Sequence, residues 1–388
     1  MDYRDVTDAS YPTATAKPFR DYPELVDMLE SRGMIITDRA RAIRKIAQVG
    51  YFRLSGYWHP SRRFHMERHE GKRILNYLDE FQSNTSFEAV FQFYLMDKSL
   101  RILMTDALER IEVYLRTIIA HELGRHDPMA HLDPSNVIRS ARTVRDGSSA
   151  GALSPHSAWL ARHDKLIAQS HEDSIRSHID ASKPIPVWVA SEAWNFGAVS
   201  KLYSMLTPRH QDSICQRLDI LERNVVDNWL INLNAVRNRC AHHARLANRP
   251  NPRTLMLPRR GYFNELNLDR HAKDRFYGMV AVVWYLLKAI GPSSDWLVKV
   301  ADVVDTMPRL PGLTFKSMGF SVEGFPRREF RIAAPAVAQV PTLEEVCSAT
   351  MDAFVAAKES ILAFPESLGT SETRKRFAEG MLDHLVDF

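Results

Sequence analysis

The feature that most constrains the fold of this chain is the stretch from Ser86 to Leu123, which contains neither glycine nor proline. Its apolar side chains recur at intervals of three and four residues: Phe87, Val90, Phe91, Tyr94, Leu95, Leu100, Leu103, Met104, Leu108, Ile111, Leu115, Ile118 and Ile119. This spacing is typical of the buried face of an α-helix. We therefore predict a long helix here and, because strand patterns are few, a mostly α fold.

Shorter helices are predicted on both sides of this segment. One begins near Tyr22 and stops before Gly33, and the next runs from an Asp38 N-cap to Gly50. The aromatic run from Tyr51 to Trp58 contains a glycine and precedes Pro60, which indicates a buried turn or extended piece. Three more helices are expected over residues 224–244, 275–290 and 295–306.

The composition along the chain suggests four parts. Residues 1–16 are predicted to be a disordered lead-in, and residues 17–330 a helical body. Within that body, residues 126–186 lose the periodicity and predict a partly ordered insertion with one short helix near 158–167. Its histidines (His156, His163, His171 and His178) indicate a solvated face. Residues 331–341 then suggest a linker, and residues 342–388 a C-terminal helical appendage.

Global composition says little about partners but favours a reducing compartment. The net charge is only +4, and the three cysteines, Cys215, Cys240 and Cys347, are too dispersed for a disulfide framework. The N-terminus lacks the apolar stretch of a signal peptide. The longest apolar run, Met279 to Leu287, is less than half of the roughly 20 residues that a membrane span needs. We predict a cytoplasmic protein with no membrane partner.

Chemistry-bearing residues gather at residues 237–243, near the end of the predicted helix 224–244. Arg237 and His242 lie about 140° apart around a helix, within one and a half turns, and Asn238 shares a face with His242. Arginine binds phosphate with two hydrogen bonds, and histidine titrates near neutral pH. This set is sufficient for RNA cleavage without a metal.

The surrounding charge is of one sign. No acidic residue occurs between Asp227 and Glu265, whereas seven arginines do: Arg237, Arg239, Arg245, Arg249, Arg253, Arg259 and Arg260. A stretch of this kind indicates a phosphate-binding surface, although a solvated basic loop is the plain alternative. Arg53, beside the aromatic run, is a further candidate for RNA contact.

The pattern Arg237-Asn238 to His242 resembles the signature of HEPN ribonucleases. The chain also resembles the bacterial abortive-infection AbiD/AbiF family, because six further segments occur in the order seen in that family. These segments are residues 17–19, 31–36, 51–58, 109–117, 194–197 and 318–320. The resemblance covers about residues 17–330.

The resemblance implies a helical HEPN-type bundle, here with additional N-terminal and C-terminal helices. It also implies a metal-independent endoribonuclease that acts as a toxin in phage defence, forms a homodimer and leaves a 2′,3′-cyclic phosphate. In some systems a small structured RNA restrains the toxin. By the same resemblance, Arg237 stabilises charge, Asn238 orients and His242 is the acid/base, while the neighbouring His243 is a support.

Two other short patterns were weighed for catalysis or metal binding. Arg116 and His121 also form an Arg-x4-His pair, but the residues between them are apolar, so a structural pairing of Arg116 with Glu112 is preferred. The two remain candidate accessory residues, because this helix is expected to pack on the Arg237 helix. The His121 to His126 segment lacks the four-residue spacing of a zincin, so neither a metal nor a cofactor is predicted.

Two other classes of function stay open from the sequence. The same arginines suit a regulator that binds a structured RNA without cutting it, which predicts binding that weakens steeply with salt. A protein-interaction module that uses only the helical face predicts no copurifying RNA.

Overall fold

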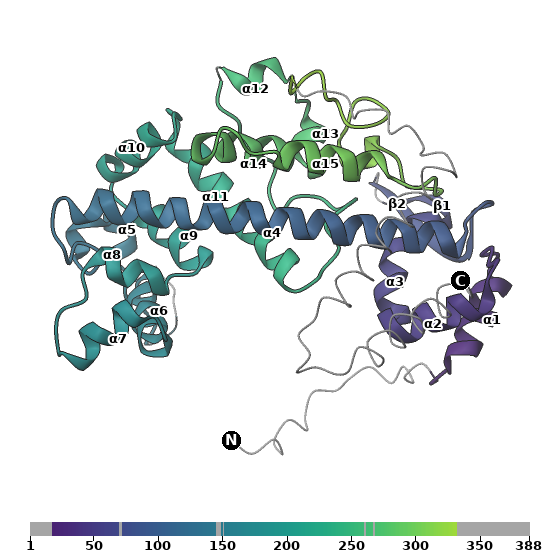
Figure 1. The fold of residues 1–388 in the computed structure, drawn as a ribbon, viewed down its shortest axis with the longest axis horizontal. Coiled ribbons are helices and arrows are strands. Elements are labelled where there is room, and N and C mark those ends of the chain that lie inside the picture. Colours follow the sequence, from purple (N-terminus) through teal and green to yellow (C-terminus); the bar gives the residue numbers. More distant parts are fainter. Residues whose placement is uncertain are drawn as a thin grey trace, which may run out of the picture. The chain divides into compact units, whose positions relative to one another are not determined.

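A computed structural model describes residues 18–69, 72–144, 149, 151–259, 261–266 and 268–331. The chain divides into two units, residues 1–333 and 334–388, and the second lies outside the described residues. The predicted lead-in and appendage therefore lie outside them too, as does the linker apart from Arg331. The described part contains fifteen α-helices and one two-stranded sheet, so the predicted mostly α fold is confirmed (Figure 1).

Helix α4, Phe87–Gly124, is the long helix predicted from the sequence. The Ser86 side chain caps its start by accepting a hydrogen bond from the amide of Ala89. At its end, a Cβ on Gly124 would lie 2.9 Å from the Trp188 ring, so glycine permits this close approach. The helices that pack on α4 include α3 (Tyr51–Trp58), α8 (Val187–Ala190), α10 (Pro208–Arg217), α11 (Arg223–Ala241), α14 (Phe276–Ile290) and α15 (Trp296–Asp305) (Figure 1).

The N-terminal region holds three helices and a hairpin. Helices α1 (Tyr22–Ser31) and α2 (Arg39–Val49) confirm the prediction, with Asp21 and Asp38 as N-caps. Strands β1 (Arg62–His69) and β2 (Lys72–Phe81) pair antiparallel and were not predicted.

The predicted turn at residues 51–58 is wrong, because Tyr51–Trp58 forms helix α3. Gly50, with a φ of 92°, separates it from α2. The buried side chains of Leu54, Tyr57 and Trp58 give this helix an apolar face, and α3 packs on α4. Such packing offsets the roughly 1 kcal/mol cost of a glycine within a helix.

The region at residues 126–186 contains more helix than the single one predicted. Helix α6 (Pro155–Gln169) is the predicted helix, but α5 (Arg139–Arg142) and α7 (Asp173–Asp180) flank it. The predicted solvated histidine face is also wrong for His156 and His163, which are buried. The indole of Trp194 donates a hydrogen bond to His163, so burial is compensated there by a polar partner.

The remaining helices surround α4 and α11. They are α8 (Val187–Ala190), α9 (Phe196–Met205), α10 (Pro208–Arg217), α11 (Arg223–Ala241), α12 (Tyr262–Glu265), α13 (Arg270–Lys273), α14 (Phe276–Ile290) and α15 (Trp296–Asp305). The Trp296 indole at the start of α15 donates to the Leu103 carbonyl on α4. Cys215 and Cys240 are buried free thiols. Across the described ranges, no helix combines the length and apolar character that crossing a membrane requires.

Candidate functional site

The predicted catalytic cluster lies at the C-terminal end of α11. This helix ends at Ala241, three residues earlier than predicted, and His242 is its C-cap. His243 has a φ of 55°, and the Ala244 amide donates to the Arg239 carbonyl. This is the hydrogen-bond pattern of a Schellman motif, in which a residue in the left-handed conformation stops the helix.

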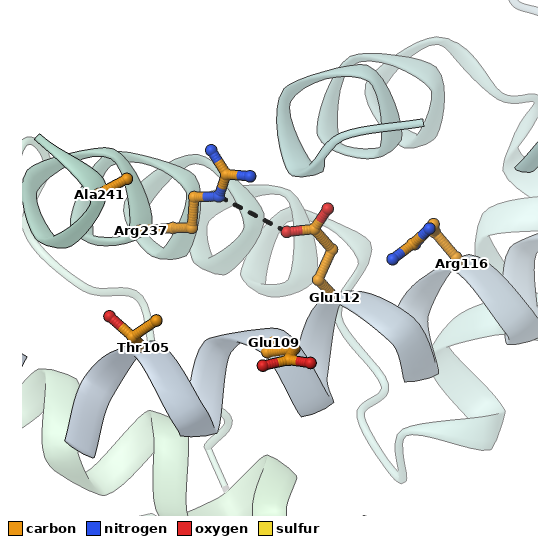
Figure 2. A pocket seen from close by; sticks show the side chains of 6 residues that line it. All are labelled: Thr105, Glu109, Glu112, Arg116, Arg237 and Ala241. Atoms are coloured by element: carbon orange, nitrogen blue, oxygen red, sulfur yellow. Dashed lines mark ion pairs between the residues drawn. The ribbon is translucent and has the colours of Figure 1, made fainter. Parts of the chain in front are cut away.

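Arg237 faces α4 across a cavity of 380 Å³ between the two helices. Figure 2 shows its guanidinium directed at Glu112, and the Arg237 Nε lies 3.7 Å from the Glu112 Oε2. The Arg237 side chain is 40% exposed, whereas that of Glu112 is 12% exposed. The cavity is lined by Thr105, Glu109, Glu112, Arg116, Arg237 and Ala241. We refer to it as the Arg237 cavity.

Glu112 is a site residue outside the catalytic and RNA-binding residues predicted from the sequence. Burial raises the pKa of its carboxyl, while Arg237, Arg116 and a hydrogen bond from the Phe196 backbone act in the opposite direction. Its signals in the sequence are its place in the segment 109–117 and its four-residue spacing from Arg116. Both guanidinium groups act on this carboxylate, so its negative charge offsets part of theirs.

Arg116 lines the Arg237 cavity, and its closest carboxylate partner is Glu192 rather than the predicted Glu112, on which it still acts electrostatically. It donates to the Glu192 carbonyl at 3.2 Å, and the Glu192 carboxylate is 3.9 Å away. Glu192 belongs to the short 3₁₀ helix Ser191–Ala193, which packs on α4. The partners of Arg116 therefore come from outside α4. The expectation that α4 packs on α11 is confirmed.

His121 does not join Arg116 in the Arg237 cavity. It lines a separate cavity of 440 Å³ beside Trp188, and its Nδ1 lies 2.6 Å from an Arg217 nitrogen. The second Arg-x4-His pair is therefore divided between two cavities.

The two histidines after α11 occupy different surroundings. His242 is exposed and is not among the residues that line the Arg237 cavity. His243 lines a neighbouring cavity of 610 Å³, and its carbonyl accepts a hydrogen bond from Arg53 at 2.7 Å. Thr105 and Ala241 border both cavities. One chain thus places Arg237 and His242 near each other in sequence but not in one cavity.

Cys240 borders the neighbouring cavity without being a candidate nucleophile. Burial raises its pKa to about 12. The thiol is therefore neutral at physiological pH, whereas a nucleophilic cysteine needs a thiolate.

The arginine stretch divides into packed and exposed members. Arg239 donates to the Pro250 carbonyl and Arg245 to that of Gly56. Burial and the nearby Arg249 lower the pKa of both Arg239 and Arg245. The exposed side chains that remain available for a phosphate backbone are those of Arg249, Arg253 and Arg259, while Arg260 lies outside the described residues.

A buried carboxylate on α4 anchors the loop that follows α11. Asp97 accepts hydrogen bonds from the amides of Leu246 and Ala247, at 3.0 and 2.6 Å, and from the Tyr57 hydroxyl at 2.7 Å. Arg101 also pairs with Asp97. This anchor holds the basic loop beside the end of α11, and nothing in the local sequence pattern indicated it.

The site combines two kinds of chemical group. Arg237 and Arg116 are permanent cations suited to phosphate, and Glu109 and Glu112 are carboxylates in the same cavity. The exposed Asn238 and His242 supply an amide and an imidazole at the adjoining helix end. This arrangement can bind a polyanion and transfer protons at its rim.

Comparison with known proteins gives one match. A family model described as Abi-like protein matches residues 44–248. The matched region is more than half of the chain, and it contains the Arg237 cavity together with His242. The comparisons with curated proteins and with solved structures gave no match.

Proposed function

The chain belongs to the family of Abi-like proteins, which points to a role in abortive infection, and we propose that it is an endoribonuclease of phage defence. The observation that carries the proposal is the Arg237 cavity, which is lined by two arginines and by Ala241, the residue directly before His242. RNA is a long ligand, so its backbone can lie along Arg249, Arg253 and Arg259 while one phosphate reaches Arg237.

In the proposed reaction the ribose 2′-oxygen attacks the adjacent phosphorus and the bond to the 5′-oxygen breaks. A base accepts the 2′-hydroxyl proton, and an acid donates a proton to the leaving 5′-oxygen. His242 is the proposed acid/base, Asn238 orients the phosphate, and Arg237 stabilises the charge on the phosphorane. The products are a 2′,3′-cyclic phosphate and a 5′-hydroxyl, and no step requires a metal.

The geometry favours a site shared between two chains. His242 is exposed and is not among the residues that line the Arg237 cavity of its own chain, which leaves room for an acid/base from a second chain. A two-fold homodimer that juxtaposes the two α11 ends would supply this acid/base. A small structured RNA bound to the same basic surface would block the site and act as an antitoxin.

The test is cleavage of single-stranded RNA by purified protein in EDTA, with analysis of the new ends. Arg237→Ala and His242→Ala are each expected to slow cleavage by about 100-fold or more. Arg176→Ala and His178→Ala on α7 are the matched controls, because they lie outside both cavities. Mixing the two inactive variants restores part of the activity if the site is composite.

The outcomes separate the candidate functions. Cyclic-phosphate ends that depend on both residues support the nuclease. Cleavage by R237A or H242A at the wild-type rate overturns the assignment. Intact RNA with steep salt dependence of binding favours the RNA-binding regulator, which the neutralising Glu112–Arg237 pair also suits. No RNA binding leaves the protein-interaction module.

A further inference from the structure

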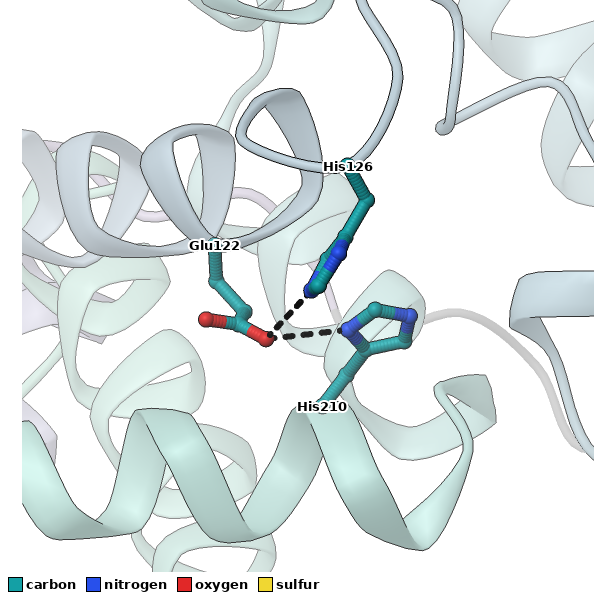
Figure 3. Close-up of side chains that lie close together, drawn as sticks. All are labelled: Glu122, His126 and His210. Carbon is teal, nitrogen blue, oxygen red and sulfur yellow. Dashed lines mark hydrogen bonds and ion pairs between the residues drawn. The ribbon is translucent and has the colours of Figure 1, made fainter.

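Glu122, His126 and His210 converge at the end of α4, away from the Arg237 cavity (Figure 3). One potential ligand atom from each residue lies within 4.8 Å of the others. The Glu122 Oε1 is 3.1 Å from the His210 Nδ1 and 3.6 Å from the His126 Nε2. The cluster joins α4 to α10, which packs on it.

Glu122 is a buried carboxylate whose charge is only partly compensated by hydrogen bonds and ion pairs. Its side chain is 0% exposed, and its Oε2 accepts no hydrogen bond from any described residue. The nearest cation to that oxygen is the half-exposed Arg125 guanidinium, at 3.6 Å. Burying an ionised carboxylate is costly unless it is paired and hydrogen-bonded, so a cation at the Oε1 would add the compensation that the one Arg125 ion pair at the Oε2 does not supply.

The hydrogen bonds around His210 assign its tautomer. The Asn136 Nδ2 donates to the Ala130 carbonyl at 2.9 Å, which leaves the Asn136 Oδ1 to accept at 3.1 Å from the His210 Nε2. The Nε2 therefore carries hydrogen, and the Nδ1 is the ring nitrogen that faces the Glu122 oxygen. Two acceptors at 3.1 Å require a proton or a cation between them.

Two of the three separations also fit a metal, and the third, between the ring nitrogens of His126 and His210, is at most 4.8 Å. Ligands bonded at about 2.0–2.1 Å in a tetrahedron lie about 3.3–3.4 Å apart. The observed 3.1 and 3.6 Å bracket this value. A metal-bound histidine ordinarily donates its other ring N–H to an oxygen, as His210 does to Asn136.

We propose that Glu122, His126 and His210 bind one Zn²⁺ ion per chain. Two imidazoles and one carboxylate are a zinc ligand set that leaves a fourth position for water. The His126 side chain is 29% exposed and provides access to that position. The carbonyl end of a long helix also favours a cation. The ion would clamp α10 to the end of α4.

The segment 121–126, for which no metal is predicted from the sequence, contributes two of the three residues of this cluster. His121 contacts Arg217 and is outside the cluster. The relevant pair is Glu122 and His126, four residues apart, and its third member, His210, comes from a helix 88 positions away from Glu122.

The test uses metal-free protein, prepared with EDTA and then dialysed, and titration with Zn²⁺ or Co²⁺ alone. Calorimetry is expected to give one site per chain, and Zn²⁺ to raise the melting temperature. His126→Ala is expected to weaken binding at least tenfold, and Asn136→Ala by about 10- to 100-fold. His178→Ala, on α7, is the control and is expected to bind as wild type.

His126→Ala is the decisive variant because its partly exposed side chain can be removed without unfolding the core. Absence of Zn²⁺ binding to the wild type overturns the proposal, as does equal affinity of H126A. Cobalt absorption bands that H126A changes support histidine ligation. RNA cleavage by H126A distinguishes this proposal from the proposed function, since His126 lies outside the Arg237 cavity.

Discussion

Asp97 and Glu112 are both acidic residues on α4 with an arginine partner, yet their surroundings differ. Asp97 is 0% exposed and is fully engaged by Tyr57, Arg101 and two backbone amides. Glu112 is 12% exposed and has a looser ion pair, 3.7 Å from Arg237, at the edge of a cavity. A closed network of short hydrogen bonds holds the fold, whereas a loose pair beside open space leaves its arginine available to a ligand.

Removing the closed network has the largest expected effect. Asp97→Ala is expected to lower the free energy of unfolding by about 3–5 kcal/mol, because it leaves the Arg101 charge and two amides buried without partners. Urea denaturation measures this loss. Asp295→Ala breaks the exposed pair with Lys299 and is the control, with an expected change below about 1 kcal/mol. Equal losses for the two variants would contradict the comparison.

The stability contributions of the Glu112 carboxylate and of the buried His131 change in opposite directions as the pH falls. Burial, with His163 nearby, lowers the pKa of His131 to about 4, so the folded state favours neutral His131. Its contribution to stability is present above about pH 6.5 and is lost as the pH falls toward 4, by at most about 3 kcal/mol. The contribution of Glu112 to stability changes with pH in the opposite direction. Its pKa is raised in the folded state, so the folded state becomes more stable as the pH falls.

The histidine contribution is measured by unfolding between pH 7 and 4. His131→Leu is expected to flatten the acid loss, because the ring Nδ1 has no hydrogen-bond partner among the described residues and leucine does not titrate. His171→Leu changes an exposed histidine and should keep the wild-type profile. If H131L lost stability between pH 7 and 4 as the wild type does, the acid sensitivity would come from groups other than His131.

For the looser Glu112–Arg237 ion pair, we expect a substitution to change RNA binding rather than stability. Glu112→Gln removes the negative charge beside Arg237 and Arg116, so we expect RNA to bind about threefold to tenfold more tightly, roughly 1 kcal/mol. Fluorescence anisotropy with a 2′-O-methyl RNA measures affinity without cleavage. Asp106→Asn, exposed on α4 and outside the cavity, is the control. Weaker RNA binding by E112Q would place the phosphate away from Arg237.

The smallest expected effect concerns the helix stop at His243. His243→Gly should stabilise the protein by up to about 1 kcal/mol, because glycine adopts a φ of 55° without a Cβ penalty. The backbone carbonyl that binds Arg53 is retained. Cleavage should also be retained, which thermal melting and the RNA assay together test. Loss of cleavage would give the His243 imidazole a catalytic role.

Much of the helix inventory was predictable because its signals are local. The apolar spacing defined α4 and α14, and Asp38 marked the start of α2 by its capping chemistry. The aromatic run at residues 51–58 was assigned wrongly because packing on α4, rather than propensity, makes it a helix. The end of α11 was placed too late because a left-handed histidine has no distinctive sequence signal.

By itself, the sequence determined the mostly α fold, the long central helix, and the position of Arg237, Asn238 and His242 at one helix end. The tertiary structure decided which groups meet. It paired Arg237 with Glu112, assigned Arg116 to Glu192, and joined His210 to Glu122. The physical reason is that periodicity and capping act within a few residues, whereas these pairs depend on where packed helices cross.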